Sequence, residues 1–176
     1  SFIQKGKVRP LDDQKSAYQF EMMVETLESS GFEHYEISNF AKEGCRSRHN
    51  SNYWKGVPYL GLGPSAHSFN GTERQWNVAH TPKYIKALEN GQLDCETEKL
   101  SANDQYNEYV MTALRTSEGV DIQHVNAQFG PECVSHFESL AAPHLDDTMV
   151  RDGERYALTL KGKLYADGIA SNLFLV

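Results

Sequence analysis

The chain has 176 residues and a mass of 19.9 kDa, which is room for one ordinary domain or for a small domain attached to part of another. Hydrophobic residues make up 39% of it and charged residues 23%, which excludes a disordered polar tract. No run of about 18 apolar residues occurs, so we expect no integral membrane segment. A formal charge of -7 disfavours binding to a nucleic-acid backbone.

The cysteines and the N-terminal residues bear on the compartment. Cys45, Cys95 and Cys133 are far apart in the sequence and odd in number, so they predict neither a disulfide framework nor a zinc site. The first residues show no apolar stretch and no cleavage site of a secretory signal, which predicts a cytoplasmic protein. Because residue 1 is not Met and helical spacing begins early, we expect the chain to be a piece of a longer protein.

The first elements form a helix–strand unit. Apolar residues recur at helical spacing from Ala17 to Leu27 and stop at Gly31, which predicts a helix over residues 13–30. Residues 32–38 alternate apolar with polar side chains, which predicts a strand. One such unit cannot cover both faces of a sheet strand, so we expect further strands from a missing N-terminal portion.

Residues 41–79 are rich in glycine, proline, hydroxyl and amide side chains and show no sustained helical period. They predict a long ordered loop region or a set of short strands, the kind of segment that carries function. Two helices with clear start signals follow, one from Thr81-Pro82 to Gly91 and one from Ser101 to Gly119.

The C-terminal part changes from helical to strand spacing. Two short helices are expected over residues 121–130 and 131–143. The segment 149–158 contains an Asp-Gly turn between two short strands and predicts a hairpin, and a helical stretch over residues 159–173 ends the chain. Three helices and a hairpin are the outline of a winged-helix-like module.

The predicted fold class is therefore α+β. We expect a terminal helix–strand unit with functional loops over residues 1–78 and a winged-helix-like domain over residues 79–176. From Thr116 to Val150 there is not one Lys or Arg, so the second domain should not bind DNA. A protein-contact or substrate-covering role fits it better.

Three motifs in residues 35–68 resemble a known family. They are Y-E-I-S-N-F-A from Tyr35, H-N-S-N-Y-W from His49 and Y-L-G-L-G-P-S-A-H-S from Tyr59. In order and spacing they resemble the oxygen-independent coproporphyrinogen III oxidase-like radical SAM proteins, and within them the HemW-like heme chaperone branch. The ending 158–170 also looks like the family's C-terminal domain.

The resemblance implies a [4Fe-4S] cluster and S-adenosyl-L-methionine (SAM) in the full-length protein, on a partial (β/α) barrel. Holding such a cluster needs three thiolates close together, and the family's C-x-x-x-C-x-x-C triad is absent from this sequence. We therefore expect no catalytic residue in this chain alone. A heme chaperone is favoured, with heme or a porphyrinogen and a heme-acceptor protein as partners. The alternatives are a coproporphyrinogen III oxidase, which decarboxylates propionates to vinyls, and a non-catalytic interaction module.

The candidate heme-binding residues surround His49. A lone histidine in a polar loop is more often a surface residue than a ligand. With the family motif around it, its imidazole becomes a candidate axial ligand of heme iron. Aromatic neighbours can lie against the porphyrin and arginines can pair with its propionates. The candidate set is Arg46, Arg48, His49, Asn50, Tyr53 and Trp54.

Other residues are candidates for contacts with SAM or for a role as a single carboxylate. The resemblance places Phe40 and Ala41 near the SAM adenine and the loop of Gly61 and Gly63 on the same cofactor side. On the residues alone, that glycine loop is a weak phosphate motif or a tight turn. Glu36 can act as an acid or base, but fixing a neighbouring arginine is the commoner role of a single carboxylate.

Overall fold

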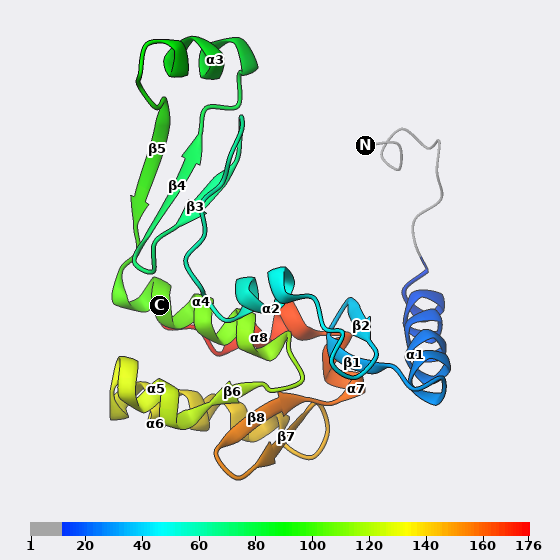
Figure 1. Ribbon diagram of the computed structural model, residues 1–176. Coiled ribbons are helices and arrows are strands. Elements are labelled where there is room, and N and C mark those ends of the chain that lie inside the picture. Colours follow the sequence, from blue (N-terminus) through cyan, green and yellow to red (C-terminus); the bar gives the residue numbers. More distant parts are fainter. Residues whose placement is uncertain (1–11) are drawn as a thin grey trace.

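The computed structural model describes residues 12–176. Helix α1 (Asp13–Ser29) confirms the predicted first helix. Its N-terminus is capped by Asp12, whose carboxylate accepts a hydrogen bond from the Lys15 amide at 3.1 Å. The helix contacts the rest of the molecule mainly through β1 (Figure 1).

The strand expected over residues 32–38 is in fact part of a hairpin. Strand β1 (Glu33–Glu36) pairs antiparallel with β2 (Asn39–Ala41). The chain reverses at Ser38, whose amide donates to Glu36 Oε2 at 3.1 Å. This local bond supports a turn that the alternation of side chains did not predict.

The region over residues 41–79 contains one helix and two short strands. Helix α2 (Arg48–Trp54) was not predicted, whereas β3 (His67–Phe69) and β4 (Glu73–Asn77) match the predicted short strands. Strand β5 (Cys95–Lys99) joins them in a sheet of order β3-β4-β5, and α3 (Thr81–Glu89) connects β4 to β5. We call β3, β4, α3 and β5 the arm, because they project from the rest of the molecule (Figure 1).

The C-terminal region packs helices against a small antiparallel sheet of order β6-β8-β7. The predicted hairpin is confirmed, with Gly153 at φ +56° in its turn. The final helical stretch is two helices instead of one, because the chain bends at Leu164 and Tyr165. The elements are α4 (Ala102–Leu114), β6 (Val120–Asp121), α5 (Ile122–Phe129), α6 (Pro131–Ala141), a 3-10 turn (Ala142–His144), β7 (Met149–Asp152), β8 (Arg155–Leu158), α7 (Leu160–Lys163) and α8 (Ala166–Asn172).

The hydrophobic core lies in this C-terminal region. Its 16 buried apolar residues all fall between Tyr106 and Leu173. At its centre Phe137 and Tyr156 meet edge to face, with ring centroids 5.2 Å apart. The mixture of helices and antiparallel strands confirms the predicted α+β class.

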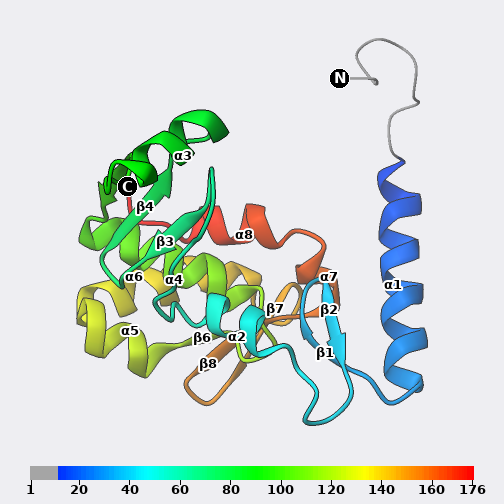
Figure 2. The same ribbon diagram turned by 45° about the horizontal axis from the view of Figure 1, so that its top comes forward.

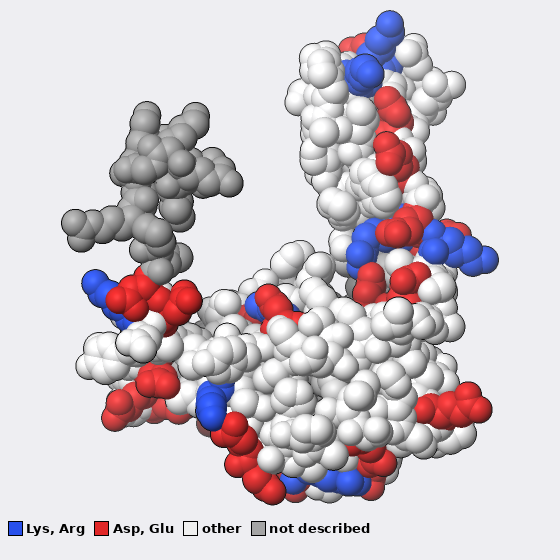
Figure 3. Space-filling model, turned by 180° about the vertical axis from the view of Figure 1, so that it is seen from behind, with Lys and Arg blue, Asp and Glu red and all other residues white. Residues whose placement is uncertain are grey.

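Figure 3 shows where charged side chains lie on one face of the molecule. On the face shown in Figure 3, Lys and Arg side chains are interspersed with Asp and Glu. The described residues of that face therefore present no continuous basic patch for a phosphate backbone.

Candidate functional site

Helix α2 carries most of the residues predicted to bind heme. It lies between the β1–β2 hairpin and the arm in both ribbon views (Figures 1 and 2). Ser47 caps it, because its hydroxyl accepts a hydrogen bond from the Asn50 amide at 3.3 Å. The Ser47 amide in turn donates to the Tyr35 hydroxyl at 3.4 Å, which ties the start of α2 to the hairpin.

The outer face of α2 presents His49 and Tyr53. Both side chains are exposed, Tyr53 to 45%, and they lie one helical turn apart. No residue among 12–176 hydrogen-bonds to the His49 imidazole, and Arg48 forms no ion pair within the same range. The ring nitrogen of His49 is thus available to a ligand, and Arg48 to an anion.

The other side of α2 is engaged with the protein. Asn50 donates from Nδ2 to Asn39 Oδ1 at 3.2 Å. The Trp54 ring meets the edge of Tyr53 at 5.0 Å between centroids and lies 5.2 Å from the Arg115 guanidinium carbon. Asn50 and Trp54 therefore hold the helix, whereas the His49 imidazole takes part in none of these contacts and Tyr53 contributes only ring contacts.

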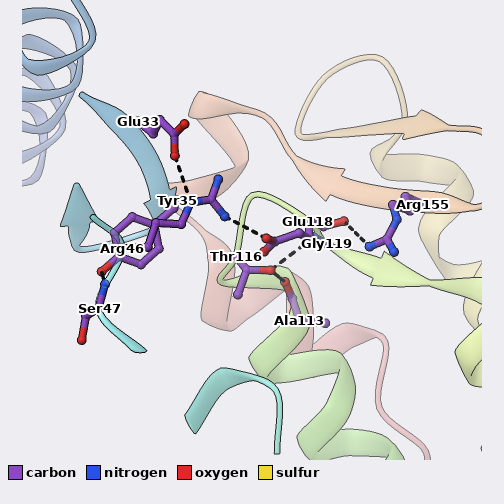
Figure 4. A network of polar contacts seen from close by, with 9 residues as sticks. All are labelled: Glu33, Tyr35, Arg46, Ser47, Ala113, Thr116, Glu118, Gly119 and Arg155. Atoms are coloured by element: carbon purple, nitrogen blue, oxygen red, sulfur yellow. Dashed lines mark hydrogen bonds and ion pairs between the residues drawn. The ribbon is translucent and has the colours of Figure 1, made fainter. Parts of the chain in front are cut away.

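Arg46 is used within the protein (Figure 4). Its guanidinium donates to Glu33 at 3.0 Å and to Glu118 at 2.8 Å, and it lies 5.4 Å from the centre of the Tyr35 ring. The hydrogen bonds that Arg46 donates to these carboxylates, the one to Glu33 above all, raise the pKa of Arg46 above its ordinary value. These contacts occupy Nε and Nη1, and the side chain is 37% exposed, so a heme propionate at Arg46 would lie beside two carboxylates.

A cavity of about 380 Å³ lies behind α2, where the hairpin meets the C-terminal region. Ser51, Trp54 and Lys55 line it from the α2 side, and His49 and Tyr53 do not. The six predicted heme residues are therefore not all on one surface. The remaining lining residues are Tyr35, Arg46, Tyr109, Ala113, Thr116, Glu118, Gly119, Asp121, His124 and Arg155.

The residues predicted to bind SAM occupy two separate places. Phe40 stacks on His34 with ring centroids 4.3 Å apart, and Ala41 is buried at the end of β2. The Gly61 amide donates to Ser68 Oγ at 3.0 Å and the Gly63 amide to the Tyr84 hydroxyl at 3.1 Å.

Those two glycines belong to the loop between α2 and β3, on the far side of α2 from β2 (Figures 1 and 2). Asn77, which is buried, fixes the loop by donating from Nδ2 to the Gly63 carbonyl at 2.9 Å. A phosphate at these amides would have to replace Ser68 and Tyr84. The tight turn is what the structure shows here.

The chain's own residues do not fit an iron–sulfur cluster. Cys45 is exposed, and Cys95 and Cys133 are half-buried on different elements. Within residues 12–176 no three His, Cys, Asp or Glu side chains lie close enough to hold a metal ion. No helix of that range is long and apolar enough to cross a membrane.

Glu36 fixes an arginine, which is the commoner role expected of a single carboxylate. Its side chain is 1% exposed and its Oε1 lies 3.4 Å from Arg115 Nε. Sequence reasoning missed Arg115 itself, which is distant in the chain. It also missed the contact of His34 with Lys163, in which Lys163 Nζ lies 3.1 Å from His34 Nδ1. Burial lowers the pKa of both groups.

Comparison with known proteins identifies relatives over nearly the whole chain. Residues 100–165 match the HemN C-terminal domain. The chain is 31% identical over 172 residues to a protein of Mycobacterium tuberculosis named heme chaperone HemW, covering 97% of this chain and 42% of the relative. It is 29% identical over 171 residues to the heme chaperone HemW of Bacillus subtilis, covering 96% and 45%.

A solved structure supports the fold. The chain is similar to coproporphyrinogen III oxidase (HemN) from Escherichia coli, described as a radical SAM enzyme, with a TM-score of 0.62 and 19% identity. The match covers 88% of this chain and 39% of that one. The chain thus spans less than half the length of these relatives. The resemblance inferred from the three motifs is confirmed: the chain is a relative of the HemN/HemW-like radical SAM proteins.

Proposed function

We propose that the chain belongs to a heme-binding protein of the HemW type and that heme binds on the outer face of α2. The exposed His49 imidazole, which no residue among 12–176 hydrogen-bonds, is the observation that carries this proposal. The relatives named heme chaperone HemW support it, because they match nearly the whole chain.

The surroundings of His49 suit a tetrapyrrole. An imidazole is a common axial ligand of heme iron, and Arg48 can pair with a propionate. Tyr53 supplies an aromatic ring beside it, and its ring centroid lies 5.8 Å from that of Tyr59. The residues around Tyr59 add three exposed apolar side chains that can cover a porphyrin edge. They are Val57, Leu60 and Leu62, which are 41%, 76% and 81% exposed.

The domain organisation is also a proposal. We assign α1 and the β1–β2 hairpin to the end of a partial (β/α) barrel, within residues 1–78, of which residues 1–11 lie outside the described range. Helices α4–α6 and the β7–β8 hairpin form a winged-helix-like domain within residues 79–176. The match of residues 100–165 to the HemN C-terminal domain supports the second assignment.

The cofactors implied by the relatives belong to the whole protein. A [4Fe-4S] cluster and SAM would be held by residues other than the cysteines of this chain. Phe40 and Ala41 remain the candidate SAM contacts. We further propose a cytoplasmic protein that passes heme to an acceptor protein.

Titration of the full-length protein with hemin, followed at the Soret band, tests the proposal. His49→Ala should abolish the specific band or weaken binding at least about tenfold, since it removes the axial ligand. The matched control is His67→Ala, which removes another exposed imidazole, on β3 of the arm. Equal affinity and an unchanged band in His49→Ala would overturn the assignment, and so would loss of the band in His67→Ala alone.

A further inference from the structure

We infer that Glu36 is a positioning residue for α2 and its imidazole, although its carboxylate is buried and does not reach the outer face. This inference rests on the proposed heme function of His49. Glu36 and Arg115 together fix the helix that carries His49.

Helix α2 is short and has no core of its own. Its seven residues include none that is buried, and the cavity of about 380 Å³ lies behind it. A helix of this length is unstable alone, so its orientation depends on specific contacts with neighbours. Those contacts come from the hairpin and from the end of α4.

The first path from Glu36 to α2 runs through two asparagines. Glu36 Oε2 accepts hydrogen bonds from the Ser38 amide and from Asn39 Nδ2. The bond from Asn39 orients its amide group, so that Oδ1 accepts from Asn50 Nδ2 at 3.2 Å. Asn50 directly follows His49, so this path fixes the helix next to the imidazole.

The second path runs through Arg115 and Trp54. Glu36 Oε1 and Arg115 Nε face each other at 3.4 Å, both buried and without a hydrogen-bond partner among residues 12–176. The guanidinium also donates to Asp167 at 3.1 Å and lies 5.2 Å from the Trp54 ring centre. The buried Trp54 indole N–H has no acceptor within the same range. Trp54 is therefore held by ring contacts, and Arg115 is one of them.

The charge of Glu36 is what joins the two paths. The hairpin is also tied to the end of α4 by the backbone, since the Ile37 amide donates to the Arg115 carbonyl at 3.0 Å. Changing Glu36 to Gln keeps the shape and that backbone bond but leaves the buried Arg115 Nε facing a neutral amide, with Asp167 as the one anion in contact with the guanidinium among residues 12–176. Arg115 should then move toward the exposed Asp167 and away from Trp54.

Fluorescence of Trp54 tests the movement without heme. The chain has two tryptophans, so Trp76→Phe leaves Trp54 as the sole tryptophan of these residues. In the full-length protein, with any tryptophan outside these residues also changed to Phe, Glu36→Gln should shift the Trp54 emission to the red and increase its quenching by acrylamide. The matched control is Glu43→Gln, an exposed carboxylate between β2 and α2. Unchanged emission and quenching in Glu36→Gln would overturn the inference.

Hemin titration links the movement to function. Glu36→Gln should weaken hemin binding about tenfold, the effect of one lost charge-assisted contact, while Glu43→Gln leaves it unchanged. An unaltered far-UV spectrum shows that the fold is intact. If Trp54 is released but hemin affinity stays the same, Glu36 does not position the ligand, whereas the His49 assignment survives. If the parent protein binds no hemin, the proposed function fails and this inference fails with it.

Discussion

The region before Leu100 and the region after it are built differently. After Leu100, 16 buried apolar residues form one continuous core between helices and a three-stranded sheet. Before it, only Val24, Tyr35 and Ala41 are buried apolar residues within the described range, and hydrogen bonds, ion pairs and ring contacts join its elements. Stability therefore resides in the C-terminal region, whereas the candidate heme site is on the part held by polar contacts.

The largest expected difference between the two regions is in the free energy of unfolding that is lost when one phenylalanine of each is truncated. Phe137→Ala removes a fully buried ring and should lower the free energy of unfolding by about 3–5 kcal/mol. Phe69→Ala removes a half-buried ring of the arm and should cost about half of that. Urea unfolding of both variants measures the two losses. Equal losses would show that the arm shares the core's stability and would remove the contrast.

Two glycines provide a second, smaller test. A Cβ at Gly119 would collide with the Tyr156 carbonyl, and φ at that residue is +68°. Gly119→Ala should therefore lower the global stability by about 2 kcal/mol or more. Gly61→Ala meets a similar collision with the His67 carbonyl, but in the loop beside the arm. We expect faster amide exchange confined to residues 59–69, and a global loss in Gly61→Ala would contradict this.

The pH dependence of stability should show the smallest effect. Burial lowers the pKa of His34 below its ordinary value of 6.5, and repulsion by Lys163 lowers this pKa further. The attraction of Glu28 and Glu36 opposes the shift. The unfolded chain then binds the proton more readily than the folded chain, so stability falls as the pH drops below about 6.5. His34→Asn should flatten this part of the profile, measured by urea unfolding between pH 7.5 and 5. An equally steep profile in the variant would assign the effect to other groups.

The sequence predicted the elements that have amphipathic spacing and caps. The helix from Ser101 is an example, because its capping box with Asp104 is present in the structure. Helix α2 was missed because none of its residues is buried, so no apolar period marks it. Strand β5 was missed because its charged side chains lie on an exposed edge, where alternation is not required.

The motifs indicated a candidate site but not its geometry. The sequence placed His49 and Trp54 in one set, whereas the structure puts Trp54 toward the cavity and His49 toward the outer face. Their five-residue spacing on the helix puts them on different sides, and Trp54 in addition lies against Arg115, which reaches α2 only through the tertiary fold. No local pattern in the sequence could reveal this partner.

Resonance Raman spectroscopy of the ferrous, heme-loaded protein tests the central claim most directly. If His49 ligates the iron, the wild-type protein shows an iron–histidine stretching band, and His49→Ala lacks it while His67→Ala keeps it. The same band at the same intensity in His49→Ala would contradict the account, because another histidine would then be the ligand.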